Sequence, residues 1–277
     1  RYDDLIKKGF LKIVRLHKNL GWGGGNIIGL ALAKAMRVEY AGFMNDDVML
    51  TQGVLEQLIE EFEKNRHVVV VQPLILYPDG AIQTAGFIVD LFLHNYPLKF
   101  APQRSLPIPQ ISGAFFIVNI KRLGSIPLFD PILFLYQDDL DVSLKIWISG
   151  KSCVLVPSSK VIHLVRRDRL KPGMYYYIVR NTLYLHVVYY PMLVLPFVMV
   201  SYVVLRLYEG FKYLMSKGTF DYIKAALLAI HDFLRYMVGR AIKRRIFYEK
   251  VLKRHYHYKM LRFALRISKL RVVKWIT

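Results

Sequence analysis

The stretch ILFLYQDDLD at residues 132–141 decides the fold, because an apolar run passes directly into three carboxylates. A second such transition lies earlier in the chain, where the apolar residues 40–44 are followed by Asn45, Asp46 and Asp47. Short apolar runs of this kind are typical of buried strands. Each acidic cluster is therefore expected at a strand end, where carboxylates repel one another unless a cation or a basic partner shares the site.

Charge is distributed unevenly along the 277 residues, whose net charge is +20 and whose apolar fraction is 54%. Residues 1–160 contain 17 Lys and Arg against 15 Asp and Glu, whereas residues 161–277 contain 23 against 5. A near-neutral first part and a basic, apolar second part suggest two roles, since a basic surface attracts nucleic acid or anionic lipid. The single cysteine, Cys153, excludes an internal disulfide and fits a reducing compartment.

Strand and helix patterns alternate along residues 1–171, with a turn at residues 77–80 and a proline-bearing loop at 97–109. The expected strands are residues 11–16, 40–44, 67–72, 111–118, 153–156 and 161–162. The expected helices are residues 30–36, 51–65 and 140–149, with Thr51 as the cap of the second. This alternation predicts an α/β sandwich.

A glycine-rich run, NLGWGGGNIIG at residues 19–29, precedes the first expected helix. Glycine lets a backbone approach a ligand closely, and the N-terminus of the following helix favours an anion. The alternative is a plain turn between a strand and a helix, which is the more common explanation of a glycine pattern by itself.

The two acidic clusters suggest different chemistry. Oxygen ligands such as those at residues 45–47 suit Mg²⁺ or Mn²⁺, which keep open positions for phosphate; the alternative is an acidic turn that caps the next helix. The three carboxylates at residues 138–141 should raise at least one pKa by like-charge proximity, which favours a general base. The alternative is favourable negative charge at a helix N-terminus, a structural part that suits Asp141.

Two isolated polar features follow. His163 ends an expected strand; a lone histidine is usually structural, but this one would serve as a metal ligand together with residues 45–47. Arg180 and Asn181 precede a long apolar run. They could hold a diphosphate, or Arg180 could be an interfacial side chain that reaches toward water.

The composition changes near residue 172. Residues 181–205 lack Lys, Arg, Asp and Glu altogether, and 25 residues are enough for a helix to cross a bilayer core of about 30 Å. Pro191 and Pro196 weaken a straight span. A bent or re-entrant helix pair within one leaflet is therefore equally consistent with the sequence.

The last part of the chain is strongly basic. Residues 240–274 carry 13 basic residues, with Glu249 as their sole acid. Tyrosines and leucines alternate with the positive charges, as in a helix that lies on an anionic membrane. The sequence therefore predicts a catalytic domain at residues 1–171 and a helical, membrane-associating region at residues 172–277.

Taken in order, these patterns resemble the family 2 glycosyltransferases of the GT-A fold, in particular their rhamnosyltransferase-like branch. Each motif is weak by itself, but their order is specific. The segments that carry the resemblance are residues 19–29, Asn45-Asp46-Asp47-Val48, Tyr77-Pro78-Asp79-Gly80 with Gln83, Ala85 and Gly86, Ser112-Gly113-Ala114, Phe129-Asp130 with Tyr136-Gln137-Asp138-Asp139-Leu140-Asp141, His163, and Arg180-Asn181.

The chain departs from the family pattern in two ways. The family's glutamate is Asp138 here, one methylene shorter, so Asp139 is the better candidate for the base. The family also begins with a strand and helix that contact the nucleotide base, and this sequence starts after them. The expected fold is therefore a GT-A-type, Rossmann-like mixed sheet flanked by helices, incomplete at its N-terminus.

The resemblance implies an inverting, metal-dependent transfer of a sugar from a nucleotide-sugar donor to a hydroxyl of a lipid-linked or surface glycan. Asp139 would be the base, tuned by Asp138, and Asp47 with His163 would hold Mg²⁺ or Mn²⁺ against the departing diphosphate. The other implied donor- and substrate-binding residues are Asn19, Gly21, Gly25, Asn26, Asn45, Asp46, Ser112, Gly113, Ala114 and Arg180.

The expected location is the cytoplasmic face of the cell membrane, with peripheral docking on anionic lipid or insertion through residues 181–205. One alternative is an inactive, membrane-bound remnant or scaffold of the same fold, which should show no metal-dependent donor hydrolysis. Another is a nucleic-acid binder that uses residues 240–274, the least favoured of the three. Steeply salt-dependent binding to DNA or RNA would support it.

Overall fold

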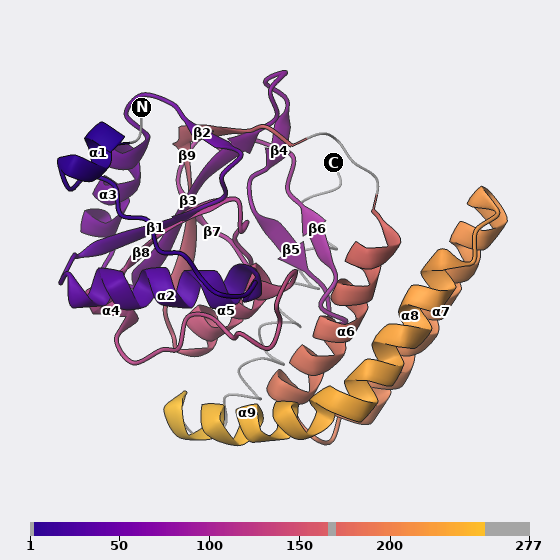
Figure 1. The fold of residues 1–277 in the computed structure, drawn as a ribbon. Helices are drawn as coiled ribbons and strands as arrows, with labels where there is room; N and C mark the ends of the chain where they lie inside the picture. Colours follow the sequence, from indigo (N-terminus) through magenta and orange to yellow (C-terminus); the bar gives the residue numbers. More distant parts are fainter. Residues whose placement is uncertain (1–2, 166–169, 253–277) are drawn as a thin grey trace.

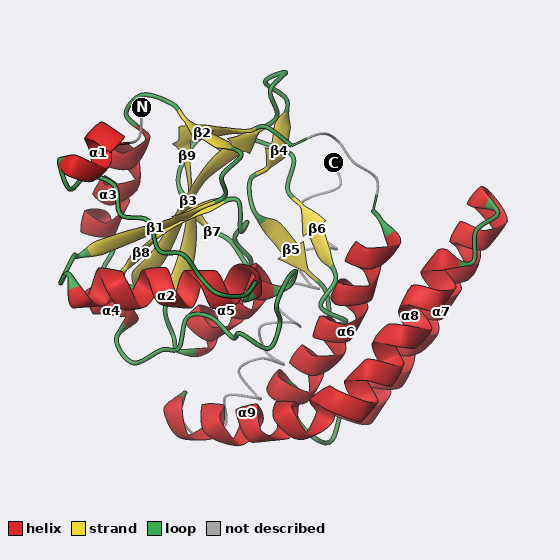
Figure 2. Cartoon of the chain, viewed as in Figure 1, coloured by secondary structure: helices red, strands yellow, loops and turns green. Residues whose placement is uncertain are grey.

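The computed structural model describes residues 3–165 and 170–252. Figures 1 and 2 show a twisted sheet between helices, with a further group of helices packed beside it. The strands of the main sheet run in the order β1 (Tyr40–Met44), β8 (Phe115–Asn119), β3 (Val68–Leu76), β9 (Ser152–His163) and β2 (Val48–Leu50), with β4 (Ile82–Thr84) paired to β3 and β7 (Leu106–Pro107) paired to β9.

The sheet is mixed, because β3 and β9 are parallel and its other strand pairs are antiparallel. Its central strand, β3, is buried on both faces, which explains a continuous apolar sequence instead of an alternating one. The helix α3 (Val54–Lys64) covers one face, and α2 (Gly21–Ala35) and α5 (Asp138–Ile148) cover the other. Two short helices, α1 (Asp3–Lys7) and α4 (Ile120–Leu123), complete this part.

Strand register brings the predicted motifs to one edge of the sheet. The turn at residues 45–47 connects β1 to β2, and β2 pairs with β9 so that Val48 lies opposite His163. The Asn45 N–H donates to the carbonyl of Ala114 at 2.9 Å. Segments far apart in the sequence therefore meet where their strands end.

The helical part packs directly against the sheet layer. It comprises α6 (Pro172–Tyr189), α7 (Leu195–Lys217), α8 (Asp221–Asp232), a π-helical turn η1 (Phe233–Met237) and α9 (Val238–Val251). A hairpin of two short strands, β5 (Phe87–Val89) and β6 (Asn95–Pro97), lies between the sheet and α6 (Figure 1). One apolar core runs without interruption from the sheet into these helices.

The charge-free run at residues 181–205 is divided between two helices. Its first ten residues, 181–190, are all buried in the protein core, and the chain then bends at Pro191 before α7 begins. Of the two alternatives for this run, a single straight helix is wrong, because the chain bends between α6 and α7. Within residues 3–165 and 170–252, no helix combines the length and the apolar character needed to cross a membrane.

Several local expectations also need correction. Residues 11–16 form no strand and expose Ile13 and Val14, because none of the described strands pairs with them. The glycine run is not a loop, since α2 begins at Gly21. Thr51 does not cap α3; its hydroxyl donates to the Lys160 carbonyl instead. The two short strands expected after residue 152 are one strand, β9.

Candidate active site

The acidic cluster of α5 follows a loop, residues 133–137, whose backbone is held in an unfavourable conformation. This segment, together with Asp138, is called the acidic loop. Phe134, Tyr136 and Gln137 have φ values of 64°, 64° and 66°, a region that residues other than glycine rarely adopt. The side-chain amide of Asn181 donates to three carbonyl oxygens of this loop at 2.8 to 2.9 Å. Arg180 donates to one of them as well, at 2.9 Å. Backbone strain of this kind persists only where the surroundings impose it, and it gathers at functional sites.

The glycines at the start of α2 allow this loop to approach closely. The N–H of Trp22 donates to the Phe134 carbonyl at 2.7 Å, and a Cβ at Gly21 would lie 2.1 Å from that oxygen. A Cβ at Gly23 would lie 2.5 Å from Oδ1 of Asp138. These two glycines therefore make room for the acidic loop, whereas Gly25 has open space around it.

The three carboxylates of α5 have different partners. Asp139 accepts from the N–H of Gly113 at 3.2 Å and from the N–H of Leu140 at 2.9 Å. Asp141 is buried, forms an ion pair with Lys145 at 2.5 Å, and accepts from the Tyr189 hydroxyl at 2.6 Å. The oxygens of Asp138 are buried and have no hydrogen-bond partner among the described residues.

These environments separate the roles of the carboxylates. Burial, together with the charges of Asp139 and Asp141, raises the pKa of Asp138 to about 8, so Asp138 keeps its proton at neutral pH. Burial also raises the pKa of Asp139, although backbone donors favour its ionised form. Neighbouring carboxyls in different environments differ in how readily they ionise, which is how an acid is separated from a base. Asp141 serves to join α5 to α6.

The second acidic cluster brings Asp47 to His163. The His163 Nε2 lies 3.0 Å from Oδ1 of Asp47, and its Nδ1 lies 2.9 Å from Oε1 of Gln83. The Gln83 oxygen can only accept, so the proton of a neutral His163 ring belongs on Nδ1. The Nε2 lone pair then faces a carboxylate. Such a pair of acceptors requires either a second proton on the ring or a shared cation.

This arrangement fits a divalent cation. A histidine whose second nitrogen is fixed by a hydrogen bond is the usual form of a histidine metal ligand, and Asp47 is open to solvent, with 43% of its side chain exposed. Among residues 3–165 and 170–252, no group of three or more His, Cys, Asp or Glu side chains gathers as a metal site. Asp47 and His163 would therefore supply only part of a coordination shell, and the remaining positions suit phosphate oxygens.

A cavity of about 410 Å³ opens between the acidic loop and the strand ends. Seven of the predicted site residues line it, namely Asn45, Ser112, Gly113, Ala114, Asp138, Asp139 and His163. The side-chain oxygen of Asn45, Oδ1, accepts from the Trp22 indole N–H at 3.0 Å. This hydrogen bond connects the start of α2 to the turn at residues 45–47. The structure thus brings together residues from separate segments of the chain.

The other predicted site residues do not line this cavity, and their roles stay predictions. Asn19 accepts from the N–H of Gly21 at 2.8 Å, a local turn contact. Asn26 donates to the Trp22 carbonyl at 3.0 Å within α2. Arg180 lies over the ring of Tyr177, 4.8 Å from its centroid, and donates to the Leu133 carbonyl of the acidic loop. The remaining ones are Gly21, Gly25, Asp46 and Asp47.

Several cavity residues were missed by the sequence reasoning. Gln137 is buried, donates to the Thr182 hydroxyl at 2.7 Å and accepts from Asn95 at 3.2 Å. Gln137 lies inside the acidic motif, directly before Asp138, so the sequence could have indicated it as a site residue. Trp22 likewise lies inside the glycine-rich run, whereas nothing in the local sequence distinguishes Phe87, Asn95 and Ile178.

The sequence is similar to those of known glycosyltransferases. The family described as "Glycosyl transferase family 2" matches residues 2–119. Polypeptide N-acetylgalactosaminyltransferase 9 of Homo sapiens is 25% identical over 199 residues, which cover 65% of this chain and 32% of that protein. N-acetylglucosaminyl-diphospho-decaprenol L-rhamnosyltransferase of Mycobacterium tuberculosis is 23% identical over 137 residues, which cover 43% of this chain and 45% of that protein.

Among solved structures, GalNAc-T7 with UDP, GalNAc and Mn²⁺ is similar, with a TM-score of 0.63 and 17% sequence identity over 96% of this chain and 48% of that chain. The predicted fold class is therefore confirmed: the chain has a GT-A fold. The family match, the relatives and the fold together support a family 2 glycosyltransferase. The chain spans less than half the length of the curated relatives named here.

Proposed function

We propose that the chain carries the active site of an inverting glycosyltransferase that moves a sugar from a nucleotide-sugar donor to an acceptor hydroxyl. The observation that supports this most is Asp139 at the wall of the cavity, oriented by the Gly113 N–H. His163, paired with Asp47, lines the same cavity. A proton acceptor and a cation-binding pair therefore share one space.

Asp139 acts as the general base. Its carboxylate takes the proton of the acceptor hydroxyl as that oxygen bonds to the anomeric carbon. The bond between the anomeric carbon and the diphosphate oxygen breaks, and the nucleoside diphosphate leaves with the electron pair. Because burial raises the pKa of Asp139, its carboxylate binds a proton more tightly than that of an ordinary aspartate.

The other site residues act on charge, Asp138 beside the base and Asp47 with His163 at the leaving diphosphate. Asp138 keeps its proton at neutral pH, so it does not compete with Asp139 as an anion. Asp47 and His163 would hold Mg²⁺ or Mn²⁺, which supplies positive charge for the leaving nucleoside diphosphate when bound. The similar GalNAc-T7 structure contains Mn²⁺, which supports a divalent ion of this kind.

The acceptor in this proposal is a lipid-linked glycan at an anionic membrane surface. The mycobacterial relative is named for a diphospho-decaprenol acceptor. In addition, α7 presents an apolar stripe to solvent, which consists of Phe197, Val200, Val204, Tyr208, Phe211 and Met215, each 50% to 72% exposed. The stripe residues are three or four positions apart, which on average matches one turn of a straight α-helix, so they follow one line along α7. A straight line of apolar side chains suits a flat surface better than it suits a partner helix in a supercoil.

Donor turnover tests the enzyme. The chain is incubated with Mn²⁺ and a panel of nucleotide sugars, and nucleoside diphosphate release is measured with and without EDTA. Release from one donor that EDTA abolishes is the expected result. An acceptor product with the opposite anomeric configuration, measured by NMR, would support inversion. Tight binding of nucleoside diphosphate with Mn²⁺ but no turnover of any donor would favour an inactive remnant.

Vesicle sedimentation tests membrane docking. The double variant Phe211→Glu, Met215→Glu should bind vesicles of phosphatidylglycerol and phosphatidylcholine on the order of tenfold more weakly, because it places charge on the apolar stripe. Leu32→Glu, on the exposed side of α2, is the matched control. Equal vesicle binding by all three proteins would contradict docking through α7.

A further inference from the structure

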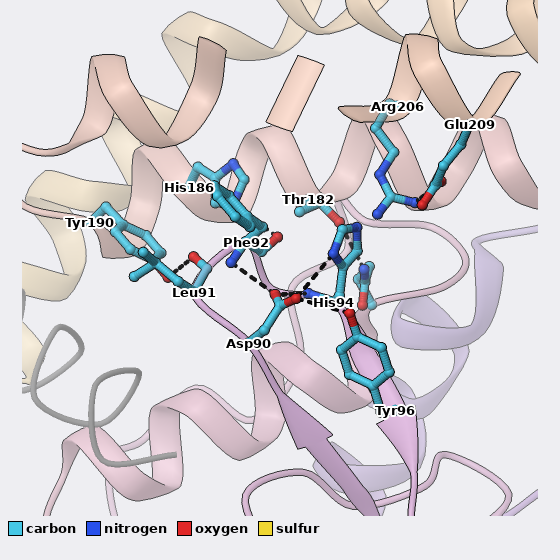
Figure 3. Close-up of polar contacts among 11 residues, drawn as sticks. Asp90, Leu91, Phe92, His94, Tyr96, Thr182, His186, Tyr190, Arg206 and Glu209 are labelled. Carbon is cyan, nitrogen blue, oxygen red and sulfur yellow. Dashed lines mark hydrogen bonds and ion pairs between the residues drawn. The ribbon is translucent and has the colours of Figure 1, made fainter. Parts of the chain in front are cut away.

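A second cavity, of about 770 Å³, adjoins the first one. It lies between the β5–β6 hairpin, α6 and α7, and it shares Asn95 and Ile178 with the active-site cavity. Its polar wall contains side chains from the hairpin and from α7, namely Asp90, His94, Tyr96, Arg206, Glu209 and Lys212. Figure 3 labels all of these except Lys212. None of them has a role in the transfer step described above.

Arg206 is the main feature of this wall. It is 6% exposed, and Nη1 forms an ion pair with Glu209 at 2.7 Å, while Nε and Nη2 have no hydrogen-bond partner among the described residues. These two nitrogens form one edge of the guanidinium, the edge that binds a carboxylate or a phosphate in a bidentate manner. The guanidinium lies over the face of Tyr202, 4.9 Å from the ring centroid. Buried charged donors without partners are costly.

His94 provides a second buried nitrogen at the same cavity. Its Nδ1 lies 3.2 Å from Oδ2 of Asp90, and its Nε2 is buried without a partner among the described residues. Asp90 also accepts from the N–H groups of Phe92 and His94 at 2.8 and 2.9 Å, and from the Tyr96 hydroxyl at 3.1 Å. The Asp90 carboxylate is thus engaged by the hairpin itself and orients the His94 ring.

The two acids at the cavity are therefore already paired, Asp90 with His94 and Glu209 with Arg206. Lys212, exposed on the next turn of α7, adds positive charge at the same wall. What the cavity offers to an anion is an unused guanidinium edge and an ammonium group. That combination of donors suits an anion with several oxygens.

The two faces of α7 connect this cavity to the apolar stripe. Arg206, Glu209 and Lys212 face the cavity, whereas Val204, Tyr208 and Phe211 face solvent. Neighbouring residues on a helix are about 100° apart, so the stripe runs alongside the cavity wall. A molecule with an apolar tail on the stripe could place its head group in the cavity and extend toward Asn95 and the active-site cavity.

We propose that the second cavity binds the phosphate groups of a lipid-linked acceptor, with Arg206 as the bidentate anchor. This inference rests on the proposed glycosyltransferase function and assigns the acceptor side of its site. The sugar of the acceptor then extends past Asn95 and Ile178, the residues common to both cavities, toward Asp139. The shared recognition chemistry is a phosphate or diphosphate ester next to an apolar chain.

Binding of farnesyl diphosphate tests the assignment, with farnesol and inorganic pyrophosphate as the probes that separate the tail from the anion. Calorimetry without metal should show farnesyl diphosphate bound most tightly, pyrophosphate more weakly and farnesol weakest. Arg206→Gln should weaken farnesyl diphosphate binding on the order of tenfold or more, the usual scale for a lost charged hydrogen-bond partner. Arg206→Lys should also weaken it, because lysine lacks the bidentate edge.

A donor-site variant serves as the matched control. His163→Ala should lose binding of UDP with Mn²⁺ and keep binding of farnesyl diphosphate, while Arg206→Gln should show the reverse. Lys212→Gln, an exposed change that leaves the core intact, should weaken farnesyl diphosphate binding about two- to threefold. It keeps the test valid if Arg206→Gln fails to fold. Arg206 and Lys212 variants that all bind like the unmodified protein would overturn the proposal.

The outcomes also separate this inference from the proposed function. Metal-dependent donor turnover without any binding of farnesyl diphosphate would reject the acceptor cavity and leave the transferase in place. Farnesyl diphosphate binding that depends on Arg206, in a protein that turns over no donor, would keep the lipid phosphate site and reject the catalytic function.

Discussion

The two acidic clusters contain similar residues but lie in opposite environments. The turn at residues 45–47 is at the sheet edge, where the Asp47 side chain is 43% exposed and meets His163. The cluster at the start of α5 is enclosed, with Asp138 5% and Asp141 1% exposed. An aspartate open to solvent beside a histidine can admit a cation, whereas burial beside other carboxylates favours the protonated form of Asp138.

The position of each cluster in the fold, more than its composition, therefore decides whether it suits metal binding or proton transfer. At the sheet edge, Gln83 fixes the His163 ring so that its Nε2 faces Asp47. At α5, burial raises the pKa of every carboxylate in the cluster. One cluster is therefore arranged for a metal and the other for proton transfer, and the following changes should affect the two independently.

Asp139→Asn should have the largest effect. It removes the proton acceptor but keeps an oxygen for the Gly113 N–H, so the turnover number should fall on the order of a hundredfold or more while the fold persists. Steady-state donor turnover at saturating Mn²⁺ measures it, with thermal unfolding as the folding control. The half-saturating Mn²⁺ concentration should be unchanged. Near-normal turnover would show that Asp139 is not the base.

His163→Ala should affect the other cluster. Loss of a ligand should raise the half-saturating Mn²⁺ concentration, and Gln83→Leu, which only frees the His163 ring, should raise it on the order of tenfold. A metal titration of donor turnover measures both variants, and isothermal binding of UDP with Mn²⁺ provides a second readout. If Mn²⁺ dependence stays the same in both variants, then Asp47 and His163 form only an ion pair.

Gly23→Ala, compared with Gly25→Ala, tests how closely α2 must approach the acidic loop. A methyl group at Gly23 would lie 2.5 Å from the Asp138 carboxyl, whereas Gly25 has nothing within 4 Å. Gly25→Ala should raise stability by up to about 1 kcal/mol through helix propensity. Gly23→Ala should lower turnover roughly tenfold by displacing the acidic loop. Chemical denaturation and donor turnover distinguish the two, and equal activity of both variants would contradict the close approach.

The overall fold was predictable where local patterns carry long-range information. The alternation of apolar runs and helix formers indicated the α/β class, and β1 occupies residues 40–44 as expected. Ordered motifs also predicted which segments meet, since Asp139, Ser112 and His163 line one cavity. Such residues can be found from sequence because each lies near the end of a recognisable element: Ser112 shortly before β8, Asp139 in the first turn of α5 and His163 at the end of β9.

The errors arise where tertiary contacts override local preference. Glycine disfavours helices, yet α2 begins in the glycine run because Gly21 and Gly23 must approach the acidic loop. The charge-free run at residues 181–205 resembles a membrane span, yet its first ten residues are protein core. In each case the deciding partner is remote in sequence.

Asp138→Asn should have the smallest effect on turnover and a distinct effect on stability. The native pKa of Asp138 is about 8, above its ordinary value of 3.8, so the folded state binds a proton more tightly than the unfolded state. This contribution to stability is fully present below pH 3.8 and is lost as the pH rises to about 8.

Asparagine resembles the protonated carboxyl and does not titrate, so Asp138→Asn should unfold at a higher temperature than the unmodified protein at about pH 9 and at a similar temperature at about pH 4. Thermal unfolding across this range measures the difference, and turnover at neutral pH should change only a few-fold because Asp138 is already neutral there. A gap in unfolding temperature that does not widen with pH would mean that Asp138 is ionised in the native protein. In that case Asp138 would be a second anion beside Asp139, and the assignment of a neutral carboxyl next to the base would fail.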